Sequence, residues 1–383
     1  MIYLDHNAST PLHEDVRAAL LSSLEFYGNP SGENNFSLVA ANKVDECRGM
    51  IAELIGVNPQ EVIFSTGSSE SIAIAIYGVV LSAPNARNEI FVSCIEHKAV
   101  LATCYAAASL TGKKVIEIPV DKNGTIDLEF IESNIGSSTA LIACMSANNE
   151  TGTIQDILKI KQLADNFEIP FFCDSTQSIG KDSNFDFREI SGTITVVSGH
   201  KIYGPKGSGL AIIPRSLQKS MFKVLPGGGQ ERGFRGGTLN LQAIVGIAKA
   251  LEIAIYQAPE FEAQMRSYKS SFLDQLSLCD QIAFSPNSSS NHVLTNTLSL
   301  RFEGLLASEI MANLKKVIVS RASACTSGQE EPSHVLLAMG LSNLQAESSL
   351  RFSFGRACSL GDMPQAVLDV SEAVDRVQFL ARQ

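Results

Sequence analysis

The stretch Ile194-Thr195-Val196-Val197-Ser198-Gly199-His200-Lys201 decides the fold class of this sequence. It begins as a nearly continuous apolar run, and such runs are typical of strands in a parallel sheet that is covered on both faces. The run leads into Lys201, which lies just before the glycine-rich turn 204–207. A lysine in this position can have a lowered pKa and act as a nucleophile toward an aldehyde. An ordinary loop lysine is exposed and inert, so Lys201 alone does not establish this role.

Similar apolar runs occur on both sides of this stretch and alternate with longer helical patterns. They predict strands at Glu61–Ser65, Glu89–Ser93, Leu141–Ser146, Pro170–Cys173 and Leu210–Ile213. This alternation predicts an α/β domain with a mostly parallel sheet. In the segment Ile72–Leu81, isoleucines alternate with alanines as in a strand. Its length and its small residues favour a buried helix instead.

The rest of the chain predicts a smaller α/β unit. A long helical segment, Leu241–Ser277, follows the glycine-rich stretch 226–230. After Asn291 the pattern predicts two strands and three helices: Leu294–Phe302, Val317–Ser320, Ala307–Leu314, Pro332–Met339 and Met363–Leu380. A chain of 383 residues exceeds what one hydrophobic core usually supports, so two domains are expected.

Polar residues follow five of the predicted strands. They are Thr66-Gly67-Ser68-Ser69, His97, Asn148-Asn149-Glu150, Asp174-Ser175-Thr176-Gln177 and Gly199-His200-Lys201. In open parallel sheets, ligands bind beyond the carboxyl ends of the strands, so these residues are expected to share one site. The serines 68 and 69 open a helix, whose free N–H groups suit an anion such as phosphate, although either serine could be only an N-cap. Asp174 is placed to keep a cofactor ring nitrogen protonated.

Charge and cysteine content narrow the class of protein. A net charge of −10 argues against direct binding of nucleic acid, which requires clustered Lys and Arg. The sequence has no recognisable signal peptide and no apolar stretch long enough to cross a bilayer, so a cytoplasmic location without membrane attachment is expected. The eight cysteines are irregularly spaced and include no C-x-x-C pair, which predicts reduced thiols and no metal site.

Several motifs together resemble the cysteine desulfurase family, whose members use pyridoxal phosphate. These motifs are Tyr3–Pro11, Asn148–Gly152, Asp174–Ser178, Ser198–Gly207, Gly227–Leu239, Ser323–Ser327 and Leu350–Ser353. The resemblance covers nearly the whole chain and is to the type with the longer mobile catalytic-cysteine loop. It implies the aspartate-aminotransferase fold (fold type I). Residues 15–255 would form a large cofactor domain, and residues 1–14 plus 256–383 a small domain that carries the catalytic cysteine.

The resemblance also implies roles around the cofactor. Lys201 would bind the cofactor aldehyde and then shuttle protons, Asp174 would pair with the ring nitrogen, and His97 would stack on the ring as an acid–base group. Asn149 and Gln177 would hydrogen-bond the ring side that carries the phenolic oxygen. The phosphate would be held by Ser68, Ser69, Ser198, His200 and, from the other subunit of a homodimer, Thr238.

The substrate of this family is L-cysteine, and Arg351 would bind its carboxylate together with Asn149. The thiolate of Cys325 would attack the substrate sulfur, leaving L-alanine and a persulfide. A sulfur-acceptor protein would then take this sulfur for iron–sulfur cluster assembly or for tRNA or DNA phosphorothioate modification. The alternative that Cys325 is a buried structural cysteine fits its polar, glycine-containing surroundings poorly.

The sequence departs from the family pattern at two places, and two other functions compete with the desulfurase interpretation. The segment Asn29–Ser37 lacks the family's histidine, and the chain ends without the tail with which some members dock iron–sulfur scaffolds, which suggests a specialised acceptor. One rival is another pyridoxal-phosphate reaction, such as transamination or selenocysteine lysis. The other is a non-catalytic sulfur-relay protein. Cys325 distinguishes the first rival, because transamination needs no mobile thiol.

Overall fold

The computed structural model describes residues 1–288, 292–321 and 331–381. A seven-stranded sheet forms its centre, in the order β2-β8-β7-β6-β5-β3-β4. The strands are β2 (Val62–Ser65), β3 (Glu89–Ser93), β4 (Lys114–Ile118), β5 (Thr139–Ala143), β6 (Phe171–Asp174), β7 (Ile194–Ser198) and β8 (Gly209–Ile212). Every neighbouring pair is parallel except those of β8, which runs antiparallel to β2 and β7. The predicted mostly parallel α/β sheet is confirmed.

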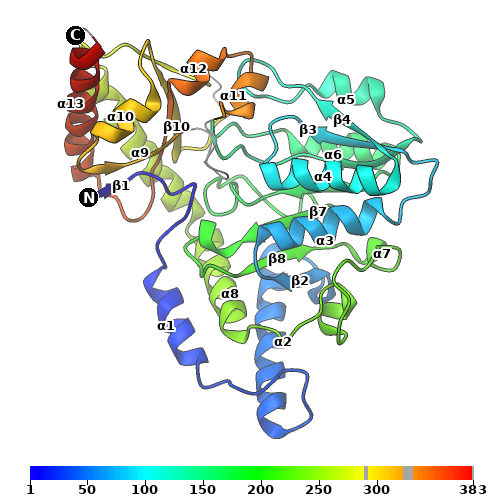
Figure 1. Ribbon diagram of the computed structural model, residues 1–383. Helices are drawn as coiled ribbons and strands as arrows, with labels where there is room; N and C mark the ends of the chain where they lie inside the picture. The colour runs from blue at the N-terminus through cyan, green and yellow to red at the C-terminus, as the bar shows by residue number, and fades with distance from the viewer. Residues whose placement is uncertain (289–291, 322–330, 382–383) are drawn as a thin grey trace.

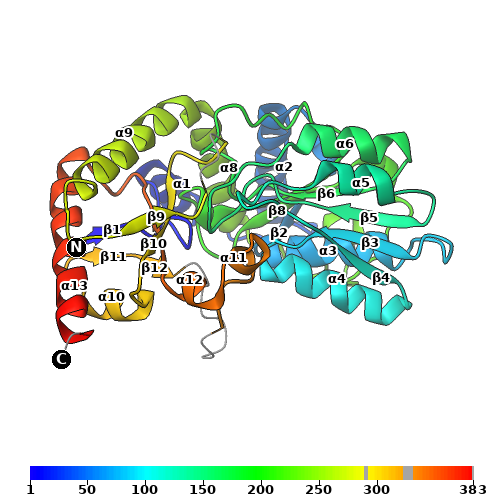
Figure 2. The same ribbon diagram turned by 90° about the horizontal axis from the view of Figure 1, so that it is seen from above.

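Helices cover both faces of this sheet (Figures 1 and 2). On one face α3 (Ser68–Val80) and α4 (Lys98–Thr111) pack against the buried residues of the strands. The opposite face is covered by α1 (Glu14–Ser23), α2 (Asn35–Ile55), α5 (Leu128–Asn134), α6 (Ile157–Asn166) and α8 (Leu241–Tyr256). The ambiguous segment of alternating isoleucines is therefore a helix, α3, whose isoleucines are buried.

The second unit contains a four-stranded antiparallel sheet in the order β12-β13-β10-β9. Its strands are β9 (Phe284–Pro286), β10 (Thr297–Phe302), β12 (Ser320–Arg321) and β13 (Ser349–Ser353). The N-terminal strand β1 (Ile2–Tyr3) joins this unit by pairing with β11 (Val317–Ile318). Its helices are α9 (Ala258–Leu276), α10 (Ala307–Asn313), α11 (His334–Ala338), α12 (Asn343–Glu347) and α13 (Met363–Ala381). The large aromatic residues of its core include Phe272 and Phe352, whose ring centroids lie 5.0 Å apart.

Two predicted elements are divided in the structure. The helical segment Leu241–Ser277 is two helices, α8 and α9, that meet at a bend of 70°. Pro259 in the first turn of α9 explains the break, because proline has no N–H to continue the preceding helix. The predicted strand Val317–Ser320 is also divided, since β11 and β12 belong to different sheets.

None of the described helices is by itself long and apolar enough to cross a membrane. The bent pair α8 and α9 meets the requirement only when the two helices are taken together.

Candidate active site

A cavity of about 180 Å³ lies beyond the carboxyl ends of strands β5, β6 and β7. Seven of the site residues predicted from the sequence line it: Ser68, His97, Asn149, Asp174, Gln177, Lys201 and Arg351. They come from segments far apart in the chain, which the parallel strands bring to one edge of the sheet. Arg351 reaches the cavity from β13 of the second unit, so both units contribute to the site.

Lys201 ends a short 3-10 turn, Gly199–Lys201, directly after β7. Its Nζ donates hydrogen bonds to the backbone carbonyls of Asn7 at 2.5 Å and Ala8 at 2.8 Å. Burial, and then the positive charge of Arg351, lower the pKa of this amine to about 8. The uncharged fraction of Lys201 near neutral pH is therefore much larger than that of an ordinary lysine, and only the uncharged amine can attack a carbonyl carbon.

Asp174 and His97 face the same cavity from two other strand ends. Asp174 is the last residue of β6 and is buried, and its Oδ1 accepts a hydrogen bond from the backbone N–H of Thr176 at 3.0 Å. His97 is the N-cap of α4, and its Nδ1 accepts from the backbone N–H of Ala99 at 3.1 Å. Because Nδ1 is an acceptor, a neutral His97 carries its proton on Nε2. Burial lowers the pKa of His97 and favours this neutral form.

The N-terminus of α3 provides an uncapped row of backbone N–H groups. Its N-cap is Gly67, which has no side chain to cap the helix, so the alternative that Ser68 or Ser69 is only an N-cap is wrong. Glycine is also required at position 209, because a Cβ there would lie 2.5 Å from the Cα of Gly67. A helix N-terminus of this kind is a favourable site for phosphate.

Three predicted phosphate ligands do not line the cavity itself. Ser69 is exposed in the first turn of α3, Ser198 is buried at the end of β7, and His200 contacts the Ser9 hydroxyl at 3.3 Å. Ser69 and Ser68 are neighbours in the first turn of α3, and Ser198 and His200 flank the start of the turn that carries Lys201. Their predicted contact with a phosphate stays a prediction.

Arg351 is held in place before any ligand binds. Its Nη2 donates to Asp5 Oδ1 at 2.6 Å, and its Nη1 donates to the carbonyl oxygen of Asn149 at 3.0 Å. The Nε atom is buried and has no hydrogen-bond partner within the described parts of the chain. A buried guanidinium with one edge fixed by a carboxylate is suited to binding a second carboxylate through its remaining donors.

Known proteins resemble this chain along nearly its whole length. The model of the family "Aminotransferase class-V" matches residues 2–363. A cysteine desulfurase from Frankia sp. (strain EuIK1) is 36% identical over 391 residues, which cover 100% of this chain and 93% of the relative. The chain belongs to the cysteine desulfurases of the class-V aminotransferase family.

Two solved structures resemble the desulfurase closely along its length. A structure described as a NifS-like protein is 30% identical, has a TM-score of 0.90 and covers 98% of this chain and 99% of its own. A second, described as SspA in complex with cysteine, is 32% identical with a TM-score of 0.80, and covers 92% of this chain and 99% of its own. The predicted family and fold type are therefore confirmed.

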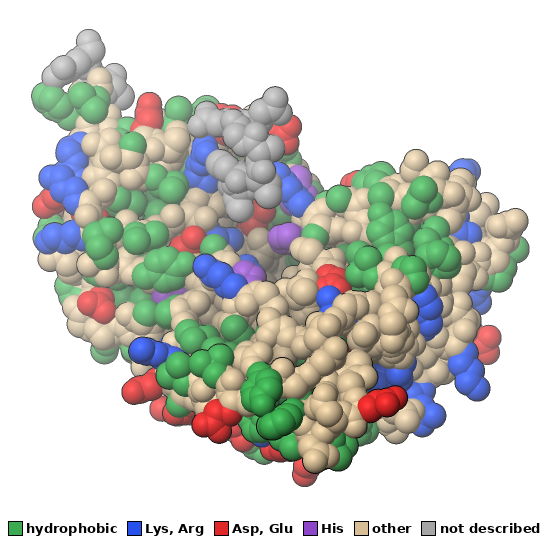
Figure 3. Space-filling view, turned by 60° about the horizontal axis from the view of Figure 1, so that its bottom comes forward, with side chains coloured by type: hydrophobic (Ala, Val, Ile, Leu, Met, Phe, Trp, Pro, Cys, Tyr) green, Lys and Arg blue, Asp and Glu red, His purple; other side chains and the backbone are tan. Residues whose placement is uncertain are grey.

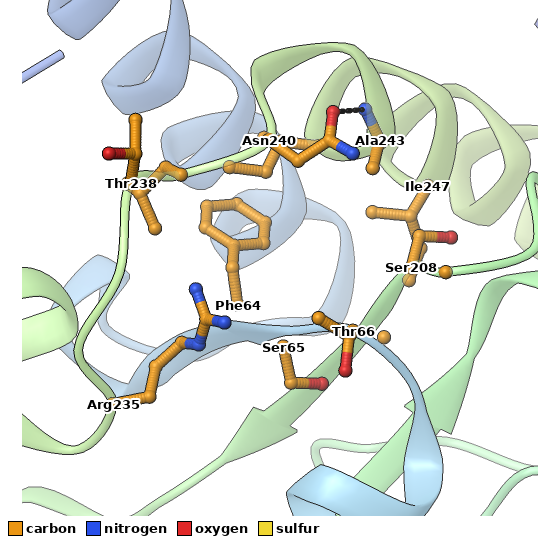
Figure 4. A pocket seen from close by; sticks show the side chains of 13 residues that line it. Phe64, Ser65, Thr66, Ser208, Arg235, Thr238, Asn240, Ala243 and Ile247 are labelled. Atoms are coloured by element: carbon orange, nitrogen blue, oxygen red, sulfur yellow. Dashed lines mark hydrogen bonds between the residues drawn. The ribbon is translucent and has the colours of Figure 1, made fainter. Parts of the chain in front are cut away.

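Thr238 of the desulfurase lies outside the Lys201 cavity. It lines a separate cavity of about 60 Å³ together with Thr66 and Arg235 (Figure 4). Arg235 Nε donates to Glu70 Oε1 at 2.8 Å, which ties this segment to the first turn of α3. Within one chain Thr238 does not line the cavity of Lys201, and its service to a partner subunit stays a prediction.

Cys325 of the desulfurase lies outside the described residues. The other seven cysteines are free, and none of them lines the Lys201 cavity. Burial raises the pKa of six of them, to about 11 for Cys47, Cys94 and Cys358 and to about 12 for Cys104, and it also raises the pKa of Cys144 and Cys173. Thiols with raised pKa values are poor nucleophiles near neutral pH.

Sequence reasoning gave no role to three residues that organise the desulfurase site. Asp5 binds Arg351, the Asn7 carbonyl binds Lys201, and the Lys181 ammonium donates to the Gln177 side chain. Asp5, the acidic residue after Tyr3-Leu4, could have been found from the sequence, because a buried arginine requires a carboxylate partner. No signal exists for Asn7, since its main-chain carbonyl does not depend on residue type.

Proposed function

We propose that this desulfurase binds pyridoxal phosphate in the Lys201 cavity and converts L-cysteine to L-alanine there. The observation that carries the proposal is one cavity that holds an amine of lowered pKa and a buried carboxylate next to an uncapped helix N-terminus. Pyridoxal phosphate has an aldehyde, a ring nitrogen and a phosphate, and each finds a matching group in Lys201, Asp174 and the start of α3. When bound, the cofactor supplies an electron sink for the substrate carbanion.

Three residues of the chain have separate roles in the proposed reaction. Arg351 orients the substrate carboxylate through donors that Asp5 and Asn149 leave free. His97 lines the cavity and, with its proton on Nε2, would donate a hydrogen bond to a ligand there, and Lys201 moves protons as the neutral and charged amine, for which a pKa of about 8 is suitable. The resemblance to a structure described with bound cysteine supports L-cysteine as the substrate.

Cys325 is the proposed sulfur acceptor. Its thiolate attacks the sulfur of the bound cysteine, the carbon–sulfur bond breaks, and the substrate carbon takes a proton to give alanine, so that the sulfur remains as a Cys325 persulfide. The described cysteines support this assignment by contrast, because none of them lines the cavity. From Cys325 the sulfur passes to an acceptor protein, for iron–sulfur cluster assembly or for nucleic-acid modification, in the cytoplasm.

The active unit is proposed to be a homodimer. The turn between α1 and α2, together with the adjoining ends of these helices, exposes an apolar surface formed by Leu21, Leu24, Tyr27, Phe36, Leu38 and Val39. The Tyr27 and Phe36 rings pack together, 5.1 Å between centroids, yet Tyr27 is 73% exposed. Figure 3 shows hydrophobic side chains gathered on this lower face of the molecule. Exposed apolar surface of this kind marks protein–protein interfaces and supports a second copy of the chain as partner.

Substitution of Lys201 tests the proposed function. Lys201→Ala is expected to lose the visible absorbance of bound cofactor and all release of alanine from cysteine, because no other lysine of the described residues lines the cavity. Lys206→Ala, at an exposed lysine of the same loop, is the matched control and should retain both properties. Normal alanine release by Lys201→Ala would disprove the assignment.

A further inference from the structure

Lys181 is a buried lysine that the proposed reaction does not use. It lies in the segment after β6 and is only 3% exposed. The described residues offer it no carboxylate within ion-pairing distance, and its Nζ donates to a single acceptor, Oε1 of Gln177. Burial, with the positive charges of Lys201 and Arg351, lowers the pKa of Lys181 well below its usual value. Charging a buried amine that has no carboxylate partner is costly, so the position of Lys181 calls for a physical explanation.

The contact with Lys181 is one of two that fix the Gln177 amide. On the other side, Gln177 Nε2 donates to the carbonyl oxygen of Asn7 at 3.2 Å. A carbonyl oxygen only accepts, so Nε2 must face Asn7 and Oε1 must face Lys181. The same Asn7 oxygen also accepts from Lys201 Nζ. A single chain of hydrogen bonds therefore runs from Lys181 through Gln177 and Asn7 to Lys201.

The orientation of Gln177 decides what it offers to a ligand. Gln177 lines the cavity beside Lys201. Its Oε1 is occupied by Lys181, and one of the two Nε2–H bonds is directed at Asn7, so the second N–H remains for a ligand. With Oε1 released, only the bond from Nε2 to Asn7 would oppose rotation of the amide, and a rotated amide would present an acceptor instead. An amide oxygen would repel an anionic ligand oxygen that the N–H attracts.

We propose that Lys181 is a positioning residue that holds Gln177 as a hydrogen-bond donor toward the cofactor. This inference rests on the proposed function, because it concerns the ligand oxygen that Gln177 meets. Lys181 itself touches neither cofactor nor substrate. Its effect is transmitted by the Gln177 amide, and this route distinguishes it from a lysine that acts only through its charge.

The test is a double-mutant cycle with Lys181→Met and Gln177→Met. Pyridoxal phosphate affinity is measured by titration, together with the pH at which the visible band of the bound cofactor changes. Lys181→Met is expected to weaken cofactor binding by about tenfold, as for the loss of one well-oriented hydrogen bond. It should also move the pH midpoint upward, because a donor to the ligand oxygen is lost. In the Gln177→Met background, Lys181→Met should change neither quantity further.

The surroundings and a matched control complete the design. The charged and titratable groups that face this region are Lys201, Arg351, Asp174 and Asp5, together with His6 and His200, and all are kept in every variant. Lys113→Met makes the same substitution at another buried lysine, which is 8% exposed and donates to the backbone carbonyls of residues 83, 84 and 87. It should leave cofactor affinity and the pH midpoint unchanged, even where its melting temperature falls.

The outcomes separate the inference from the proposed function. A wild-type chain that does not bind pyridoxal phosphate would contradict the proposed function itself. A wild-type chain that binds the cofactor, with Lys181→Met equal to wild type in both measurements, would overturn only the role of Lys181. A further shift of the midpoint by Lys181→Met in the Gln177→Met background would also overturn it, because Lys181 would then act by charge rather than through the amide.

Discussion

Lys201 is the residue whose ionisation most affects the proposed chemistry. Its pKa in the cofactor-free chain is about 8, whereas an unfolded lysine titrates near 10.4. Between these values the unfolded chain binds more protons at this residue than the folded chain. The contribution of Lys201 to stability therefore rises with pH from about 8 to about 10.4, and at lower pH its buried charge is destabilising.

The reactivity of the Lys201 amine should show the same lowering of its pKa. Labelling of the cofactor-free protein with acetic anhydride over a series of pH values, read by mass spectrometry on the peptide with Lys201, is expected to have its midpoint near pH 8. The urea-unfolded chain serves as control, and there the midpoint should lie near 10.4. Equal midpoints in the two states would show that the folded site does not activate this amine.

The site residues that could be predicted share one physical origin. Side chains such as Asp174 and Asn149 follow apolar strands, and the carboxyl ends of parallel strands meet at one edge of a sheet. Asn7 and Lys181 could not be found in this way. Asn7 acts partly through its backbone carbonyl, and Lys181 contacts Gln177, four residues before it, so neither has a strand-end position that marks it.

At the scale of elements, the glycine-rich segment 226–238 depends on one buried ion pair. Arg48 of α2 donates to both carboxylate oxygens of Glu231, at 2.6 and 3.0 Å, and Glu231 also accepts from the backbone N–H of Phe64 at 2.7 Å. Glu231 and Arg232 have φ angles of 47° and 55°, a conformation that non-glycine residues rarely adopt. The ion pair therefore holds a strained backbone against α2 and β2.

Removing one partner of this pair should be strongly destabilising. Glu231→Ala leaves the Arg48 guanidinium buried without its carboxylate, which typically costs about 3–5 kcal/mol. Urea unfolding of the cofactor-free chain measures this change in the free energy of unfolding. Glu252→Ala removes a partly exposed partner of Lys249 and should cost at most about 1 kcal/mol. If both variants unfolded at the same urea concentration, the ion pair would not support the segment as described.

Helices and strands could be predicted from the sequence where burial determines which positions are apolar. The central strands are apolar on both faces and were found as continuous runs. The sequence pattern does not predict strand β4 (Lys114–Ile118), because it lies at the sheet edge and its residues, apart from Ile118, are exposed or only half-buried. The sequence pattern does not predict strand β13 either, since its buried serines and arginine give no apolar run. The contact between Arg48 and Glu231 joins residues 183 positions apart, which no local pattern reveals.

At the scale of the whole molecule, Thr238 connects the site to the proposed dimer. Lys201→Ala and Thr238→Ala subunits, each inactive or weakened alone, are co-expressed with different affinity tags and purified as mixed dimers. If Thr238 serves the partner's cofactor, one site of each hybrid carries both lesions and the other carries neither, so activity should return. Hybrids no more active than the parent variants would show that Thr238 acts within its own chain, and an active monomer would contradict the dimer.

The central claim is that the sulfur of L-cysteine is transferred to Cys325. The most direct measurement is mass spectrometry of the protein after turnover with L-cysteine and without acceptor, with alanine quantified in parallel for wild type and Cys325→Ser. We expect one additional sulfur on the peptide that contains Cys325 and little on the seven other cysteines. Cys325→Ser should bind cofactor and cysteine but release almost no alanine, because a hydroxyl stays protonated and is a poor nucleophile toward sulfur. Sulfur carried mainly by another cysteine, or normal alanine release by Cys325→Ser, would contradict the claim.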